Sequence, residues 1–290
     1  MLLTNRIVWN DNGTNIDISN EMASVAGVSK VLPIVAAQDY IYLGSEFPFN
    51  HRYITVKVAN DQSSTISAVH LWNGSTWEAA LDVQDFTSSS GKTLAQSGHI
   101  VWTPDPNKSW MKDNTNHSGH TITGLSGMSI FNLYWVRITF SADLKNTTEL
   151  QYIGHKFADD NDLKLQYPDL VRSNVYLQFL AGKTTWEEQH VLAAEQIIND
   201  MKEKNILKSK NQILDYRLLT QPAVHKVASL IYNALGQDYR DLKNDAEANY
   251  KKAMSQRIFN VDTNMNATLE DGEVYIGTGY LRRWAQFLAQ

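Results

Sequence analysis

Apolar and polar residues alternate along several short segments in the first half of the chain. Apolar residues such as Ile54 and Val56 stand at every second position in these segments, which is the two-residue period of a β-strand. The segments with this alternation are residues 51–60, 65–72 and 134–140. Asn73-Gly74 follows the second segment directly and is a strong signal for a β-hairpin. Short strands separated by polar loops predict an antiparallel β-sandwich over residues 39–158.

The second half shows helical spacing instead. Apolar residues recur three or four positions apart at Leu192, Ala194, Ile197, Ile198 and Met201. Thr185 and Glu188 have the spacing of a capping box, which predicts that this helix begins near Thr185. A second helix is predicted over residues 220–236 and a third over 241–259, with a small helix in 207–216. Helices of this kind pack as a bundle.

Composition agrees with this division. Charged residues number 30 of 183 in residues 1–183 and 27 of 107 in residues 184–290. Sparse charge is typical of sheets and denser charge of surface helices. The predicted class is therefore α+β, an antiparallel β-sandwich domain plus a C-terminal α-helical bundle. The predicted domains are an N-terminal arm or strand pair (1–38), a β-sandwich-like domain with a trailing linker (39–183) and a helical bundle with a C-terminal tail (184–290).

Several classes of protein are disfavoured by composition. The chain of 290 residues has no cysteine, which excludes disulfides, thiolate catalysis and cysteine-ligated metals. Its net charge of −5 does not fit a protein that coats nucleic acid electrostatically. The longest apolar stretch, residues 31–37, is too short to span a membrane. The N-terminus lacks the pattern of a signal peptide, so we expect folding in a cytoplasm and no membrane partner.

Catalytic motifs are hard to find. Neither the Gly-x-Ser-x-Gly elbow nor a P-loop occurs, and the interpretation is that the protein is not an enzyme. His117 and His120 lie near Asp113 and form either a surface metal site or a polar loop. A glycosidase needs two carboxylates, for which the chain offers Asp159, Asp160 and Asp162. The alternative is that these aspartates cap the next turn.

One segment has the spacing of an EF-hand calcium loop. Oxygen-bearing side chains fall at the ligand positions Asp262, Asn264, Asn266, Thr268 and Glu273. Two of these are asparagines where aspartates are usual, and Ala267 stands where the turn favours glycine. The alternative is an Asx-rich turn in which side chains bind backbone amides. No cofactor is predicted, and calcium binding by this loop is left open.

Tryptophan is abundant, with eight residues in the chain. Exposed indole rings stack on sugars in carbohydrate-binding proteins, and the candidates here are Trp72, Trp77, Trp102 and Trp110. The alternative is that these large rings fill a core or a subunit contact.

Several longer patterns carry a resemblance to a known family. In the β-rich half they are Leu43-Gly-Ser-Glu-Phe-Pro-Phe-Asn50, Trp72-Asn-Gly-Ser-Thr-Trp77, Gln96-Ser-Gly-His-Ile-Val-Trp102, Tyr134-Trp-Val-Arg137, Gly154-His-Lys-Phe157 and Tyr167-Pro-Asp-Leu170. In the helical half they are Asp215-Tyr-Arg-Leu-Leu-Thr-Gln-Pro-Ala-Val-His225, Ile231-Tyr-Asn-Ala-Leu-Gly236, the 262–273 loop and Gly279-Tyr-Leu-Arg-Arg283. The first group resembles a β-domain of neck proteins of tailed bacteriophages, and the second resembles head-to-tail adaptor (connector) proteins.

The resemblance implies a structural protein of the virion neck, assembled in the host cytoplasm. It implies a homo-oligomeric ring, usually twelve-fold, that lies beneath the portal protein and contacts a downstream neck or tail protein. DNA would pass through its channel without sequence recognition. A β-domain of this size before the bundle departs from that pattern, and it would decorate the outside or dock a fibre.

The C-terminal segment is the candidate interface with the portal or with a neighbouring subunit. It combines apolar and arginine anchors, namely Tyr280, Leu281, Arg282, Arg283, Trp284, Phe287 and Leu288. The alternative is a last helix that packs on its own bundle. Two other functions stay open: a carbohydrate-binding or receptor-binding β-sandwich protein of the phage particle, and a hydrolase that uses the carboxylates at 159–162.

Overall fold

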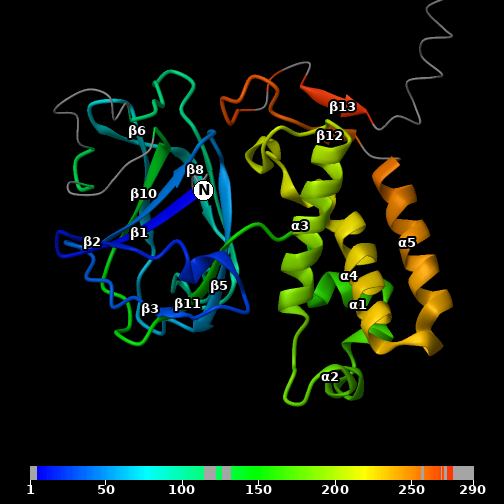
Figure 1. Cartoon of the computed structure of the whole chain (residues 1–290). Coiled ribbons are helices and arrows are strands. Elements are labelled where there is room, and N and C mark those ends of the chain that lie inside the picture. The colour runs from blue at the N-terminus through cyan, green and yellow to red at the C-terminus, as the bar shows by residue number, and fades with distance from the viewer. Residues whose placement is uncertain are drawn as a thin grey trace, which may run out of the picture. The chain divides into compact units, whose positions relative to one another are not determined.

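The computed structural model describes residues 5–113, 122–125, 132–255, 258–268, 270 and 273–276 (Figure 1). The chain divides into two compact units, Met1–Gly154 with Asn264–Thr268, and His155–Thr263 with Leu269–Gln290. The first unit is built on antiparallel sheets and the second on helices, so the predicted α+β class is confirmed. Within the described ranges, no helix has both the length and the apolar character needed to cross a bilayer.

Two antiparallel sheets form the first unit. One has the strand order β2-β1-β4-β10-β6-β7, with β2 (Thr14–Asp17), β1 (Asn5–Asp11), β4 (Tyr40–Ser45), β10 (Tyr134–Phe140), β6 (Ile66–Trp72) and β7 (Trp77–Ala79). The other has the order β3-β11-β5-β9-β8, with β3 (Lys30–Val31), β11 (Glu149–Gly154), β5 (His51–Val58), β9 (Gly98–Thr103) and β8 (Leu81–Asp85). A single turn of 3₁₀ helix, η1 (Glu21–Ala23), precedes β3.

The two sheets share one apolar core, as in a β-sandwich. Alternate residues of strands from both sheets pack into it, including Ile41, Leu43, Val69, Val136, Ile138, Ile54, Ile100, Trp102 and Leu150. The hairpin predicted at Asn73-Gly74 is confirmed: Trp72 pairs with Trp77 across the turn, and Gly74 has φ +101°. Only a residue without Cβ adopts this conformation without strain.

The N-terminal residues belong to the first sheet. β1 pairs with β2 in a hairpin, which corresponds to the strand pair considered for residues 1–38. β1 also pairs with β4 along six residues, from Asn5 opposite Ser45 to Asn10 opposite Tyr40. Ile7 and Trp9 belong to the sandwich core, so the described part of this segment is a strand pair of the sheet, with β2 at its edge.

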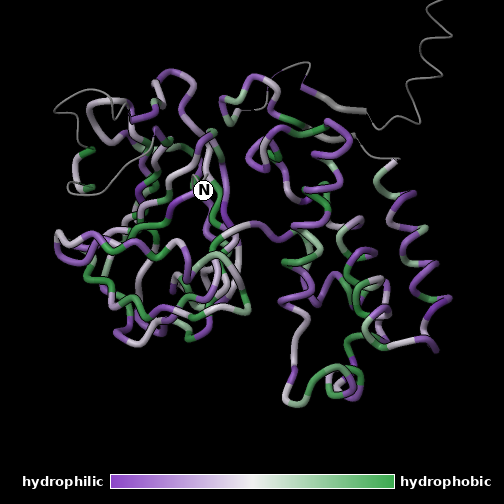
Figure 2. The backbone as a smooth tube through the Cα atoms, viewed as in Figure 1, coloured by the Kyte–Doolittle hydropathy of each residue, from purple (hydrophilic) through white to green (hydrophobic). Residues whose placement is uncertain are grey.

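Five α-helices and several 3₁₀ turns make up the described part of the second unit. The helices are α1 (Asp160–Gln166), α2 (Ser173–Phe179), α3 (Glu187–Glu203), α4 (Thr220–Leu235) and α5 (Arg240–Ser255). The 3₁₀ turns are η2 (Pro168–Val171), η3 (Lys210–Gln212), η4 (Tyr216–Leu219) and η5 (Gln237–Tyr239). A short antiparallel pair, β12 (Ile258–Asn260) and β13 (Val274–Ile276), follows α5. Apolar residues recur along α3 and α4 (Figure 2), and several of them, including Ile197, Val227 and Ile231, belong to the buried apolar core of this unit.

The predicted bounds are confirmed for α4, and they are wrong at the start of α3 and at the end of α5. α4 spans the residues predicted for the second helix, and Gly236 ends it with φ +106°. The capping box at Thr185 is wrong, because α3 begins after Trp186 and no side chain of its own caps it. α5 ends at Ser255, whereas the prediction continued to residue 259, where β12 now lies.

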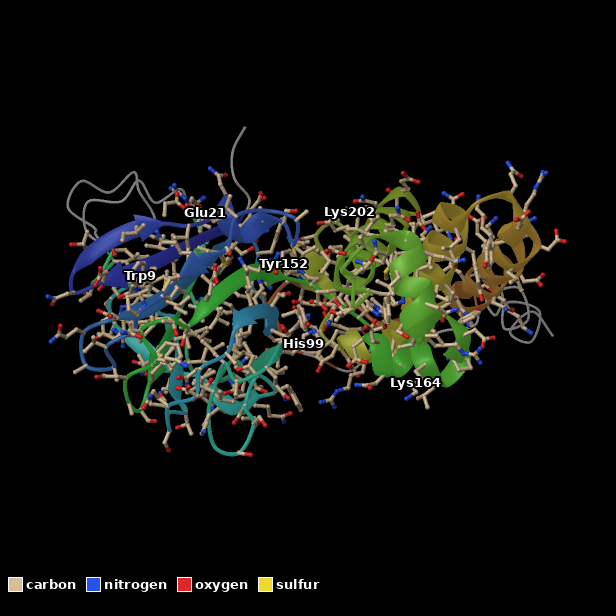
Figure 3. All side chains as sticks on the ribbon, turned by 90° about the horizontal axis from the view of Figure 1, so that it is seen from below. Trp9, Glu21, His99, Tyr152, Lys164 and Lys202 are labelled. Carbon is tan, nitrogen blue, oxygen red and sulfur yellow. The ribbon has the colours of Figure 1, made fainter. Side chains whose placement is uncertain are left out.

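Two short helices lie before the boundary placed near residue 183. α1 and α2 belong to the helical unit, and the sequence analysis had assigned their residues to the trailing linker. The segment predicted as a small helix over 207–216 contains the 3₁₀ turns η3 and the start of η4. Lys164 on α1 and Lys202 on α3, labelled in Figure 3, lie on exposed faces of their helices.

Candidate binding surfaces

The face of the first sheet that points away from the sandwich core is aromatic. Trp135 lies directly over Gly44, where a Cβ atom would come within 2.8 Å of the indole ring. Trp72 and Trp135 are 2% and 1% exposed and form a second apolar cluster with Ile122 and Leu125. Strand alternation therefore places large rings on both faces of this sheet, and on the outer face Trp72 and Trp135 are buried.

Two of the four predicted glycan-stacking tryptophans are buried. Trp72 belongs to the second apolar cluster described above. Trp102 is fully buried between the sheets, edge-on to Phe49 at 5.4 Å between ring centroids. Their faces are not open to a sugar, so for these two residues the core alternative describes the structure. The rings are buried because one lies under the segment 122–125 and the other inside the sandwich.

Trp77 and Trp110 are half-buried and already engaged. The indole N–H of Trp77 donates to the backbone oxygen of Thr123 at 2.8 Å. The indole N–H of Trp110 donates to the backbone oxygen of Trp135 at 3.2 Å, and its ring packs 5.6 Å from Phe49. These bonds hold both rings in fixed positions, and part of each ring still faces solvent.

Arg137 lies at the centre of the outer aromatic face. Its guanidinium is 5.2 Å from the Tyr40 ring centroid and 5.0 Å from that of Trp77, within the range of cation–π contacts. Burial raises the pKa of the neighbouring Tyr42 to about 12, although the positive charge of Arg137 acts in the opposite direction. We call the half-buried residues Tyr40, Trp77 and Arg137 the outer aromatic cluster.

The 262–273 loop contains the predicted Asx turns. Asn264 accepts a hydrogen bond from the amide of Asn266 at 3.1 Å, and Asn266 accepts one from the amide of Thr268 at 2.7 Å. This is the alternative in which side chains bind backbone amides, and it is confirmed. Ala267 adopts φ +60°, the left-handed conformation in which the calcium-loop pattern has glycine.

The two carboxylates among the predicted calcium ligands are both buried. Asp262 is 1% and Glu273 5% exposed. The Glu273 carboxylate accepts from the amide of Thr263 at 2.8 Å, from its hydroxyl at 2.9 Å and from the amide of Glu270 at 3.2 Å. The side-chain oxygens of Asn264, Asn266 and Glu273 thus accept hydrogen bonds from backbone amides of the loop, and calcium binding stays a prediction.

The aspartates at the start of α1 cap that helix, as the second interpretation predicted. Asp159 accepts from the amides of Asn161 and Asp162, and Asp162 accepts from the amide of Asp159, a complete capping box. Burial raises the pKa of Asp162. These bonds give Asp159 and Asp162 a structural role at the helix start.

Asp160 instead binds three other segments, an arrangement that sequence reasoning missed. Its carboxylate accepts from His190 Nε2 at 3.0 Å, from the Tyr176 hydroxyl at 3.0 Å and from the backbone amide of Trp186 at 3.2 Å. The last bond gives an acceptor to the amide of Trp186 at the start of α3, a helix without a side-chain cap of its own. We call Asp160, Tyr176, Trp186 and His190 the Asp160 network.

The charge of Asp160 is stabilised by this network. Burial is the largest influence and raises its pKa. The hydrogen bond and charge of His190, the Trp186 amide and the Tyr176 hydroxyl together lower it, so the pKa lies below the ordinary value. His190 is 1% exposed, and its Nδ1 has no hydrogen-bond partner among the described residues. The network connects α1, α2 and α3 through these hydrogen bonds.

A further set of residues stands out by exposure. Large apolar side chains project from the surface of the helical unit at Leu165, Leu177, Leu180, Leu192 and Leu242. Leu192 had been predicted to face the core, and its 43% exposure shows that it does not. Leu177 and Leu180 are 59% and 61% exposed and lie three residues apart. No signal in the sequence separated these leucines from core residues.

Other candidates lie outside the described residues. These are His117, His120 and the whole interface segment Tyr280, Leu281, Arg282, Arg283, Trp284, Phe287 and Leu288. Asp113, next to the histidines, is buried. Within the part of the chain that the structure describes, no three histidine, aspartate or glutamate side chains are grouped so that they could hold a metal ion.

Comparison with known proteins gave no relative: no family model, no curated protein and no solved structure matches this chain.

Proposed function

We propose that the protein is a structural component of a tailed-bacteriophage virion, a head-to-tail adaptor in the neck. It forms a homo-oligomeric ring beneath the portal protein, links the capsid to a downstream neck or tail protein, and lets DNA pass. In this role it has no catalytic step and no membrane partner. The helical unit supplies the ring contacts, and the β-sandwich unit decorates the ring or docks a fibre.

The observation that carries the proposal is the role of the family-like residues in the helical unit. The Asp215 carboxylate accepts from the amide of Arg217 at 3.0 Å and begins η4. Pro222 occupies the first turn of α4, and Gly236 ends that helix. Two residues that carry the resemblance, Pro222 and Gly236, thus lie at the two ends of the central helix of this unit, which supports a bundle of the adaptor type.

The surface chemistry supports the same role. Leu177 and Leu180 are 59% and 61% exposed, and exposed apolar side chains that gather in a patch are typical of protein contacts. A net charge of −5 suits a channel through which DNA slides, because a basic lumen would bind the phosphate backbone.

The test is binding to the cognate portal protein. Full-length protein is mixed with assembled portal rings and sedimented, and a control tube without portal measures the protein that sediments by itself. We expect the protein to co-sediment with portal at a fixed ratio that saturates. The same amount of protein in the pellet with and without portal would contradict the proposal.

A second candidate, glycan binding, is supported by one observation. The outer aromatic cluster of Tyr40, Trp77 and Arg137 combines half-buried rings with a cation on one face of the sheet. A glycan array probed with the wild type and with Trp77→Ala tests it. Binding that Trp77→Ala abolishes would favour this function, and an array without signal would leave the adaptor function as the better account.

A further inference from the structure

Arg137 occupies a central position on the outer face of the first sheet. It lies on β10, directly opposite His70 of the neighbouring strand β6. Its guanidinium contacts the rings of Tyr40 on β4 and Trp77 on β7. Residues that lie opposite each other on neighbouring strands share a face of the sheet. The outer aromatic cluster and His70 therefore lie together, with the positive charge of Arg137 among them.

This charge has no acidic partner in the first unit. None of the ion pairs between described residues includes Arg137. Glu78, which follows Trp77 in the sequence, instead pairs with Lys108 at 2.8 Å. The undescribed residues of this unit, 1–4, 114–121 and 126–131, contain no aspartate or glutamate. A guanidinium that is half-buried without a carboxylate is unusual, because a charge loses hydration on burial.

The two cross-strand neighbours of Arg137 leave its charge uncompensated. Tyr42 lies opposite Arg137 on β4, and burial raises the pKa of its hydroxyl to about 12. Burial, together with the charge of Arg137, lowers the pKa of His70. Near pH 7 the phenol is thus protonated and the imidazole neutral, so neither side chain carries a negative charge.

The accessible part of the guanidinium lies at its outer end. Arg137 is half-buried, and its Nε atom is buried with no hydrogen-bond partner in the ranges described above. The side chain rises from the sheet through Nε, so the part that solvent reaches lies beyond that atom, at the two terminal nitrogens. These two nitrogens form the fork that binds a carboxylate through two parallel hydrogen bonds.

The rings beside the guanidinium are fixed in advance. Tyr40 and Trp77 both pack on Tyr42, with ring centroids 6.0 and 5.5 Å from it, and Tyr42 is fully buried. The indole N–H of Trp77 also donates to the backbone oxygen of Thr123 at 2.8 Å. A ligand that stacks on these half-buried rings therefore costs little conformational entropy in the protein.

This combination selects one chemistry of ligand. The guanidinium fork suits a carboxylate, and aromatic rings provide a flat apolar surface for the ring of a sugar. One arginine in a chain of net charge −5 lacks the basic stripe that a nucleic acid needs. A sugar with a carboxylate, such as a uronic acid unit, supplies both the ring and the single negative charge.

We propose that the outer aromatic cluster binds a carboxylate-bearing sugar of an acidic polysaccharide. Arg137 binds the carboxylate, and the rings of Tyr40 and Trp77 contact the face of the sugar. This inference goes beyond the adaptor function. It narrows the second candidate function, glycan binding, and rests on it for the sugar.

Biolayer interferometry with the full chain tests the role of the carboxylate. The immobilised probes are polygalacturonate, alginate and hyaluronan, each beside a carboxyl-reduced preparation of the same polysaccharide. Reduction converts the carboxylate to a primary alcohol and keeps the sugar ring, so the members of each pair differ in charge. We expect binding to at least one acidic polymer, and an affinity at least about tenfold lower for its reduced form.

Each other outcome has a separate meaning. Equal affinity for the acidic and the reduced polymers would overturn the role of the carboxylate and leave glycan binding in place. No binding to any of the polymers would overturn both. Binding to poly-glutamate as tight as to the best polysaccharide would overturn the assignment of a sugar. The portal experiment is independent of all three, so none of them decides the adaptor function.

Substitutions at the cluster give a second readout. Arg137→Gln should lower the affinity for the acidic polymer at least about tenfold and leave that for the reduced polymer unchanged. Arg137→Lys keeps the charge without the fork and should restore part of the binding. Trp77→Ala should weaken binding to both forms, because the ring contacts the sugar in either.

The matched control for the charge is Arg172→Gln. Arg172 lies in the helical unit, is 66% exposed and pairs with Asp169, so its loss should leave glycan binding as in the wild type. Far-UV circular dichroism verifies that each variant is folded. An Arg137→Gln protein that binds the acidic polymer like the wild type would refute the proposal. The comparison of polymers uses the wild type alone and decides the proposal even where a variant is unstable.

Discussion

The Asp160 network provides the sharpest test of how the helical unit is held together. Asp160→Ala removes a carboxylate that accepts hydrogen bonds from His190, Tyr176 and the backbone amide of Trp186. His190 is 1% exposed, so its ring loses the one partner that the described residues give it. The start of α3 loses the acceptor for its first amide.

The size of the effect follows from these bonds. A hydrogen bond to a charged group contributes about 1.5 to 3 kcal/mol, but the Asp160 side chain is 26% exposed and water replaces part of the loss. We therefore expect Asp160→Ala to lower the free energy of unfolding by about 3 kcal/mol. Asp160→Asn keeps the shape and one acceptor oxygen, and should cost about half as much.

The measurement is urea denaturation followed by far-UV circular dichroism, which reports the helical unit. The matched control is Asp169→Asn, because Asp169 is 72% exposed in an ion pair with Arg172. Exposed pairs of this kind contribute little, so the control should stay within about 0.5 kcal/mol of the wild type. An Asp160→Ala protein within about 1 kcal/mol of wild type, or a control as unstable as Asp160→Ala, would refute the reasoning.

The same network predicts a dependence on pH. The pKa of Asp160 is below its ordinary value in the folded protein, so the folded state holds this proton less strongly than the unfolded state. Its contribution to stability is therefore present above the ordinary aspartate pKa of about 3.9, and is lost as pH falls through the lower folded value. We expect the stability difference between wild type and Asp160→Asn to shrink below about pH 4.

Three further predictions address other parts of the chain. Tyr250→Phe removes the hydroxyl that donates to Asp200 at 2.5 Å between α5 and α3, and should cost about 1 to 2 kcal/mol in urea denaturation; no change would contradict a role for this bond. Burial raises the pKa of Tyr42 to about 12, so the contribution of this hydroxyl to stability is present below about pH 10 and is lost as pH rises through 12. Tyr42→Phe should reduce the loss of stability at alkaline pH, measured by urea denaturation. An unchanged alkaline profile would contradict the assignment. In isothermal titration, the Asx-turn interpretation of loop 262–273 predicts no heat at millimolar calcium, and a saturable isotherm would establish a calcium site instead.

Much of the architecture follows from local patterns in the sequence. Two-residue alternation located β5, β6 and β10 because each has one face in the sandwich core. Helical spacing located α4 to within a residue, because Pro222 and Gly236 mark its two ends. These signals act over a few residues, and the structure has the elements that they predict.

Other elements could not be predicted because tertiary contacts decide them. α1 and α2 have seven residues each, and Leu165 and Leu177 point outward on them, which breaks the apolar spacing that identifies a helix. The start of α3 is satisfied by Asp160, a residue 26 positions earlier, and not by the nearby Thr185. A pattern search within a short window does not detect such a bond.

The candidate sites were harder still, for the same reason. Strand alternation places Trp72 and Trp77 near the same turn but does not say which ring is covered, and the structure buries only the first. Asp160 and His190 are 30 residues apart and carry no motif. The Asx turns of the 262–273 loop were predicted because they form between neighbours in sequence.

The most direct test of the central claim is electron microscopy of the purified protein, alone and mixed with its portal. The account predicts closed rings with a central channel, and rings that stack on one face of the portal in the mixture. A monomer in both samples, with bare portal beside it, would contradict the account.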